Sequence, residues 1–368
     1  MSHSSDTHGH DGHGHDHMPF QAHHFDDPEQ QFDSGKLGMW LFLVTEVLFF
    51  SGMFCAYALY RSRNPEVWQF SSQYLNATLG AFNTGVLLFS SLSMAWGVRC
   101  AQLRQRTGLV VSLAVTLGCA SIFLGVKAVE YTHKWDIGLL PAGTYESQFA
   151  PLPEHGSGLS PWLINLSIVP ALFVVGFAIW YVVTMVKGQK RESEVSGPML
   201  VTALCYFVGV GVGLAFQNAE AKDHGSEHSV AAVSTDAEHM DDHGAHDSES
   251  LDKHDEASHE GDDRHAGDPT LALVSTSVRH DVVVPGAPTL AEIDQRGGAG
   301  LFFSIYYCMT GVHAIHILGG MVVLTWLLVR ATKDHFNEQY FGPVDYVGLY
   351  WHLVDLIWIY LFPLLYLI

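Results

Sequence analysis

Seven apolar runs of roughly 20 to 30 residues constrain this chain of 368 residues more than any other feature of its sequence. Each run is long enough to cross the roughly 30 Å hydrocarbon layer of a bilayer as an α-helix, the form in which an isolated segment satisfies its backbone polar groups in lipid. We therefore predict an all-α integral membrane protein, a bundle of seven transmembrane helices. The predicted spans are residues 37–60, 78–98, 109–131, 162–186, 198–216, 300–329 and 344–368.

The charges of the short loops predict the orientation of the bundle, because Lys and Arg are retained on the cytoplasmic side. One set of loops carries Lys36, Arg99, Arg104, Arg106, Lys187, Lys190, Arg191, Arg330 and Lys333. The opposite set carries only Arg61, Arg63 and Lys134. We expect a cytoplasmic N-terminus, a periplasmic C-terminus and no cleaved signal peptide, because the first apolar run follows a long hydrophilic stretch.

Composition divides the chain into six segments. Residues 1–36 and 217–298 are rich in His, Asp, Glu, Gly and Ser, and we predict that both are disordered because they cannot bury enough apolar surface to offset chain entropy. The others are the first three spans (37–131), an outer loop (132–161), a helix pair (162–216) and the last two spans (299–368).

The polar segments determine which partners and metals the chain could bind. The chain has 18 Lys and Arg residues against 38 Asp and Glu, so no basic surface is expected for nucleic acid. The histidines have irregular spacing that defines no coordination shell, which leaves a solvated spacer and weak metal binding as alternatives. Candidates for weak binding are His8, His10, His13, His15, His17, His239, His243 and His246.

Glu46 is the clearest ionisable residue within a predicted span. A charged side chain near the bilayer centre costs about 2.5–3.5 kcal/mol on insertion scales, so it requires a partner or a function. No basic residue is close to Glu46 in the sequence. We expect a buried hydrogen-bond partner for it. A functional carboxyl and a purely structural carboxyl bonded to a neighbouring helix are equal alternatives.

The last two spans place four further polar side chains near mid-membrane. His313 and His316 lie three residues apart in TGVHAIHILGG, as do His352 and Asp355 in YWHLVDLIWIY. Residues with this spacing share a helix face. The set could form a zinc or iron site, but we favour a hydrogen-bond network that fixes helix packing.

Two more polar positions belong to the predicted structural network. Lys127 and Glu130, in GVKAVEYTH, lie near the outer interface and either pair with each other or extend to the headgroups. Asn83, in AFNTGVLLFSSLS, is a small polar residue of the kind that joins helices in lipid. None of these residues alone predicts a reaction.

Taken together, five runs resemble subunit III of the haem–copper terminal oxidases, the cytochrome c oxidase subunit 3 family. They are VTEVLFFSGMFCAYALY around Glu46, FNTGVLLFSSLS, VEYTH around Glu130, TGVHAIHILGG and YWHLVDLIWIYLF. Their order matches the family, and the resemblance as a whole covers about 140 of the 368 residues. The chain resembles the short five-helix bacterial form, departing from it by the inserted pair 162–216 and the long acidic loop.

This resemblance implies an accessory subunit that binds no redox centre of its own, in a bacterial cytoplasmic (inner) membrane. Haem and copper would lie in a catalytic subunit I, with subunit II or another electron-entry subunit beside it, and the complex would reduce O2 with electrons from cytochrome c or quinol. It implies phospholipid in a cleft lined by Glu46, and a structural role for the other polar residues, none of them catalytic.

Two alternatives remain at this point. The first is the branch of the same family that accompanies nitric oxide reductases. The second is a divalent-metal transporter with a site built by His313, His316, His352 and Asp355. The few carboxylates along the predicted spans argue against an ion path of this kind.

Overall fold

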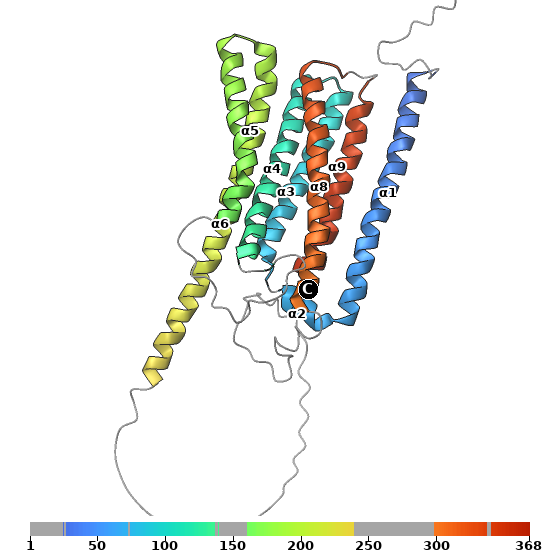
Figure 1. Ribbon diagram of the computed structural model, residues 1–368. Helices are drawn as coiled ribbons and strands as arrows, with labels where there is room; N and C mark the ends of the chain where they lie inside the picture. The colour runs from blue at the N-terminus through green and yellow to red at the C-terminus, as the bar shows by residue number, and fades with distance from the viewer. Residues whose placement is uncertain are drawn as a thin grey trace, which may run out of the picture. The chain divides into compact units, whose positions relative to one another are not determined.

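The computed structural model describes residues 25, 27–72, 74–136, 139, 160–238, 298–336 and 340–368 (Figure 1). In these ranges the chain forms eight α-helices, and seven of them are long and apolar enough to cross a membrane. The helices are α1 (Pro28–Arg63), α2 (Pro65–Ser72), α3 (Ala77–Gln102), α4 (Arg106–Asp136), α5 (Pro161–Val186), α6 (Lys190–Glu238), α8 (Gly298–Thr332) and α9 (Gly342–Tyr366). The predicted all-helical architecture with seven spans is confirmed for the described residues.

The chain divides into two compact units, Met1–Phe216 with Pro288–Ile368, and Gln217–Ala287. In the second unit the structure describes only helical residues, 217–238. All packing described below belongs to the first unit.

The helices extend beyond the predicted spans. Apolar composition identifies only the part of each helix that lies in the hydrocarbon layer, and it does not indicate where the helix begins or ends. Helix α1 begins at Pro28, so 28–36 are helical although they were predicted to be part of a disordered tail. Asp27 precedes it as N-cap, Pro28 occupies the first turn, and Glu29 suits the positive end of the helix dipole. Helix α6 likewise continues past Phe216 to Glu238 through a stretch with no proline.

Helix α2 was not predicted, because it is too short to register as an apolar span. Its sequence PEVWQFSS opens with proline and glutamate, an N-terminal helix signal that follows directly after Asn64. Val67 and Trp68 are buried, and Trp68 contacts Phe302 of α8 at 5.7 Å between ring centroids. The helix thus covers one end of the bundle, here called the α2 end. The opposite end, with loop residues 103–105, 187–189, 333–336 and 340–341, is called the short-loop end.

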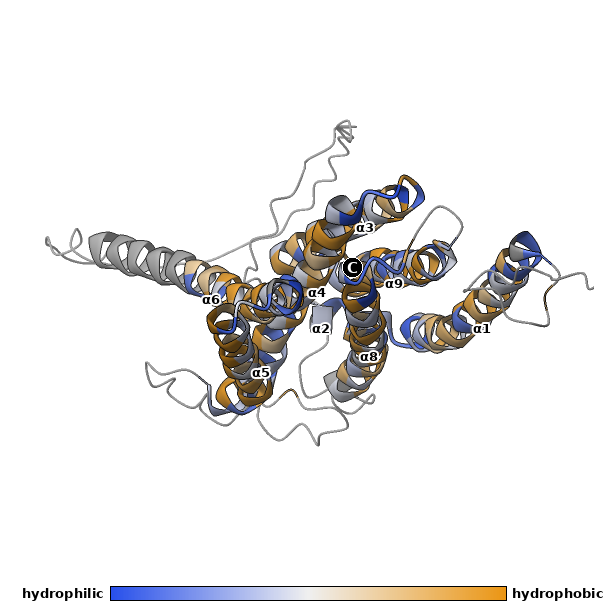
Figure 2. Ribbon diagram, turned by 90° about the horizontal axis from the view of Figure 1, so that it is seen from above, coloured by the Kyte–Doolittle hydropathy of each residue, from blue (hydrophilic) through white to orange (hydrophobic). Residues whose placement is uncertain are grey.

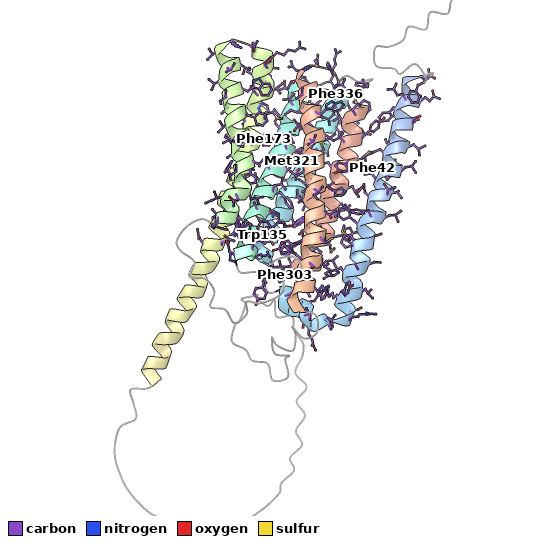
Figure 3. The ribbon with its side chains drawn as sticks, in the orientation of Figure 1. Phe42, Trp135, Phe173, Phe303, Met321 and Phe336 are labelled. Carbon is purple, nitrogen blue, oxygen red and sulfur yellow. The ribbon has the colours of Figure 1, made fainter. Side chains whose placement is uncertain are left out.

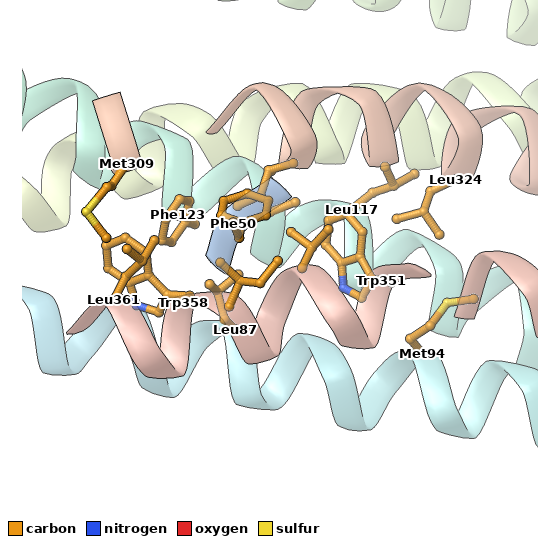
Figure 4. Close-up of a cluster of buried hydrophobic side chains, with 14 of the residues drawn as sticks. Phe50, Leu87, Met94, Leu117, Phe123, Met309, Leu324, Trp351, Trp358 and Leu361 are labelled. Carbon is orange, nitrogen blue, oxygen red and sulfur yellow. The ribbon is translucent and has the colours of Figure 1, made fainter. Parts of the chain in front are cut away.

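Helices α3, α4, α8 and α9 form the packed core of the first unit (Figures 1 and 2). Trp351 and Trp358 project from α9 into this core and are completely buried (Figure 4). Each indole N–H also has a partner on α3, since Trp351 donates to Ser90 at 2.9 Å and Trp358 to Thr84 at 3.1 Å. These bonds fix the register of the antiparallel pair α3 and α9 by satisfying polar groups that lipid could not.

Helix α6 docks on α4 through glycines. A Cβ atom at Gly125 would lie 2.2 Å from the carbonyl oxygen of Tyr206, and one at Gly209 would lie 2.3 Å from the carbonyl oxygen of Ile122. Small residues of this kind let membrane helices approach backbone to backbone. Trp135 of α4 lies at the α2 end (Figure 3). It packs edge to face on Trp162, which anchors the start of α5.

We predict that Gly209→Ala destabilises the protein, because the added methyl group must displace the α4 backbone, at a cost of about 1–3 kcal/mol. Gly211→Ala is the matched control, since nothing lies within 4 Å of its added Cβ and alanine favours the helix. Thermal unfolding in mild detergent compares the two variants. Equal midpoints would contradict the close α4–α6 packing.

Candidate functional site

A buried carboxylate joins three helices near the α2 end of the core. Glu130 Oε1 accepts hydrogen bonds from Lys134 Nζ at 2.8 Å, from the Tyr306 hydroxyl at 2.7 Å and from the Tyr366 hydroxyl at 2.6 Å. Its Oε2 accepts from Lys127 Nζ at 2.8 Å. Glu130 and both lysines are buried, so Lys127 and Glu130 pair inside the protein and do not extend to the headgroups.

Aromatic rings surround the Lys127 ammonium group. It lies 4.6 Å from the ring centroid of Trp358 and 5.1 Å from that of Tyr366, and it donates a hydrogen bond to the Tyr366 hydroxyl at 2.5 Å. Cation–π attraction is strongest over tryptophan and increases when the cation is desolvated. The rings and Glu130 together offset the cost of keeping a cation away from water.

The sequence did not assign the two tyrosines or Lys134 to this cluster. Tyr306 lies in LFFSIYY and Tyr366 in the last turn of α9, both among apolar residues that predict only a membrane span. A tyrosine in an apolar run usually finds a polar partner for its hydroxyl, and this signal could have flagged them. Which partner they find depends on how the helices pack.

Glu46 has the expected hydrogen-bond partner, on a different helix. Its Oε2 lies 2.9 Å from Nε2 of His316 on α8, and both side chains are about one-fifth exposed. His316 is held in turn, because its Nδ1 lies 2.8 Å from the carbonyl oxygen of Val312. Phe49 and Phe50 pack against the imidazole ring. This polar pair is therefore shielded on one side and open on the other.

Helix α1 stands at the side of the core and is exposed along most of its length (Figure 2). At its short-loop end the Tyr346 hydroxyl donates to the carbonyl oxygen of Phe32 at 2.8 Å, and at its α2 end the Tyr57 hydroxyl donates to the carbonyl oxygen of Leu364. Between these points lies Glu46. Lys36 also pairs with Asp345 of α9 near the short-loop end, at 3.8 Å. Helix α1 thus has polar contacts with the core near each end and one in the middle.

The other predicted polar residues do not bond to one another. His352 Nδ1 lies 2.6 Å from the hydroxyl of Ser91 on α3. Asn83, His313 and Asp355 are buried, and their polar side-chain atoms have no hydrogen-bond partner in the described part of the chain. The two histidines of TGVHAIHILGG face different neighbours, because His316 meets α1 whereas His313 stacks on Trp358 of α9 at 5.3 Å.

The described residues contain no group of three or more His, Cys, Asp or Glu side chains that could hold a metal ion. The eight histidines proposed for weak metal binding lie outside the described residues. The metal site considered for His313, His316, His352 and Asp355 therefore has no support from the geometry of the bundle.

The residues that bond in the Glu130 cluster and in the Glu46–His316 pair all lie in the part of the chain that relates it to known proteins. A family model described as cytochrome c oxidase subunit III matches residues 20–150 and 296–368, more than half of the chain. The chain belongs to the cytochrome c oxidase subunit III family. The match leaves out residues 151–295, which include the whole of α5 and α6.

Individual relatives share a short region. A "Probable cytochrome c oxidase subunit 3" of Mycobacterium leprae is 38% identical over 65 residues, 18% of this chain and 32% of that protein. The "Cytochrome c oxidase subunit 3" of Thermostichus vulcanus is 38% identical over 69 residues, 18% of this chain and 34% of the relative. A "Heme-copper oxidase subunit I+III" of Aeropyrum pernix is 38% identical over 71 residues, 19% of this chain and 9% of that protein.

These matches cover about a third or less of the length of each relative. Together with seven candidate spans, the family identifies this chain as a multi-pass membrane protein of the cytochrome c oxidase subunit III family. The name of the Aeropyrum protein joins subunits I and III in one chain, which is a property of that protein.

We predict that Glu130→Gln lowers the free energy of unfolding by about 3–5 kcal/mol, because it removes the charge that compensates two buried lysines. Glu194→Gln is the control, since its pair with Arg106 is solvent-exposed and such pairs contribute at most about 1 kcal/mol. Denaturant titration in mixed micelles measures both. Similar small losses would show that the Glu130 cluster does not hold the helices together.

We predict that Glu46→Leu loosens α1 from α8, whereas Glu46→Gln retains a hydrogen bond to His316. Met53 of α1 provides the probe, because its sulfur lies 4.0 Å from Cys308 Sγ on α8. In a Met53→Cys, Cys55→Ser background, a short bifunctional thiol reagent should link positions 53 and 308. Compared with the background that retains Glu46, cross-linking should be severalfold slower in the Glu46→Leu variant and little changed in the Glu46→Gln variant. Equal rates in these three proteins would contradict the prediction.

Proposed function

We propose that this chain is the accessory subunit III of a haem–copper terminal oxidase, which reduces O2 to water in aerobic electron transport coupled to proton translocation. The observation that carries the proposal is the family match, combined with the meeting of its motif residues in space. Glu46 from the first motif bonds His316 from the fourth, and Glu130 from the third bonds Tyr366 at the end of α9.

In this proposal the chain supports the catalytic subunit and does not take part in electron transfer. Haem and copper are held by subunit I, with subunit II or another electron-entry subunit receiving electrons from cytochrome c or quinol. The tightly packed α3, α4, α8 and α9 supply a rigid body for docking, and the Glu130 cluster makes that body stable in lipid.

Glu46 would line a lipid-facing cleft, since its side chain is partly exposed on the sparsely packed α1. A hydrogen-bonded carboxyl at this depth can maintain the local structure. Phospholipid binding, and proton uptake by subunit I, would depend on that structure. We assign structural roles to Asn83, Glu130, His313, His316, His352 and Asp355. The bonded members, Glu130, His316 and His352, each join two or more helices.

We propose the bacterial cytoplasmic membrane as the location, with the short-loop end facing the cytoplasm. Nine Lys and Arg residues in and beside the loops of that end, against three at the α2 end, support this orientation. It places the N-terminus inside and the acidic segment 217–298 outside. The fold is compatible with either O2 or nitric oxide as the electron acceptor of the complex. A subunit that accompanies a nitric oxide reductase is therefore the nearest variant of this proposal.

Purification of the tagged native protein in mild detergent tests the proposal. We expect a large haem-containing subunit to co-purify, a reduced-minus-oxidised haem spectrum, and oxygen consumption with reduced cytochrome c or quinol. Nitric oxide consumption without oxygen consumption would favour the variant branch. A colourless protein that purifies alone with bound zinc or copper would contradict both.

A further inference from the structure

An open groove lies at the α2 end of the bundle, between α1 and the last turn of α9. Its volume is about 570 Å³, within the range of small-ligand sites. Phe54, Ala58, Pro65 and Leu364 supply apolar walls. Arg61, in the last turn of α1, supplies the cationic group of the groove lining.

Tyr57 holds Arg61 in place and leaves most of the guanidinium N–H donors available. One guanidinium N–H donates to the Tyr57 hydroxyl at 3.2 Å, and the guanidinium lies 5.9 Å from the centroid of that ring. Tyr57 is itself fixed by its bond to the carbonyl oxygen of Leu364. Among the described residues Arg61 forms no ion pair, so its remaining N–H groups can bind an anion.

The position of Arg61 along α1 places it at a headgroup layer. Lys36 and Arg61 are 25 positions apart, or about 37 Å along the helix axis, slightly more than the roughly 30 Å hydrocarbon layer. Lys36 pairs with Asp345 at the short-loop end, so the two cations lie near opposite membrane surfaces. The apolar part of the groove, at Phe54 and Ala58, therefore lies one to two turns deeper in the membrane.

We propose that this groove is a phospholipid-binding site in which the Arg61 guanidinium holds the phosphate and the apolar walls hold acyl chain. A planar guanidinium suits bidentate phosphate binding. Apolar walls favour a lipid over the acidic segment 217–298, whose charged residues would lose water there. The site lies 15 positions, about 22 Å, from Glu46 and goes beyond the proposed cleft.

Native mass spectrometry of the full chain, purified with any partners it retains, tests the site by counting bound phospholipids. Arg61→Gln should lose one retained phospholipid per chain and bind added phosphatidylglycerol about tenfold more weakly. Arg63→Gln is the matched control, since Arg63 lies in the same helical turn but does not line the groove. Ala58→Trp should displace the same lipid by filling the groove without a change of charge.

Equal lipid retention by wild type and Arg61→Gln would overturn the site, and so would equal losses from both arginine variants, which would reflect surface charge alone. Excess inorganic phosphate should leave the lipid bound, because it cannot replace the acyl-chain contacts. Displacement of the lipid by phosphate, or full retention in Ala58→Trp, would contradict the groove as its location. These outcomes do not depend on which catalytic subunit is present.

Discussion

The Glu130 carboxylate accepts four hydrogen bonds from α4, α8 and α9, and the packing of the core depends on this shared acceptor. Breaking any one bond would leave a polar group that hydrocarbon cannot solvate, so the three helices are held in a single register. Lys127 extends the cluster to Trp358, whose indole bonds Thr84 of α3. Four helices are thereby linked through groups only a few ångströms apart.

Helix α1 is attached to the core in a different way. It belongs to the same unit but has apolar side chains exposed along most of its length. Its polar attachments are one hydrogen bond each at Phe32, Glu46 and Tyr57, together with the ion pair of Lys36 and Asp345. A helix held at separate points leaves spaces beside it that lipid can fill. Both proposed lipid contacts, at Glu46 and at the Arg61 groove, lie on this helix. The rigid core and the sparsely attached helix thus suit the docking and lipid binding proposed for this chain.

The sequence predicted what depends on composition and periodicity along one helix. It located the seven spans and singled out Glu46 and Glu130, because ionisable residues in apolar runs are conspicuous. It could not identify their partners, since helix pairing depends on three-dimensional packing. His313 and His316 illustrate the limit: residues three apart on a helix differ by about 60° in direction, enough for one to meet α9 and the other α1. The glycine contacts between α4 and α6 were missed for the same reason.

The most direct test of the account is a density map of the purified complex by electron cryomicroscopy. We expect this chain beside a haem–copper subunit, with Glu130 bonded to Lys127 and Tyr366, Glu46 facing lipid density, and no redox centre among its own helices. A map in which the chain stands without a haem–copper partner, with a metal ion bound between α8 and α9, would contradict the central claim.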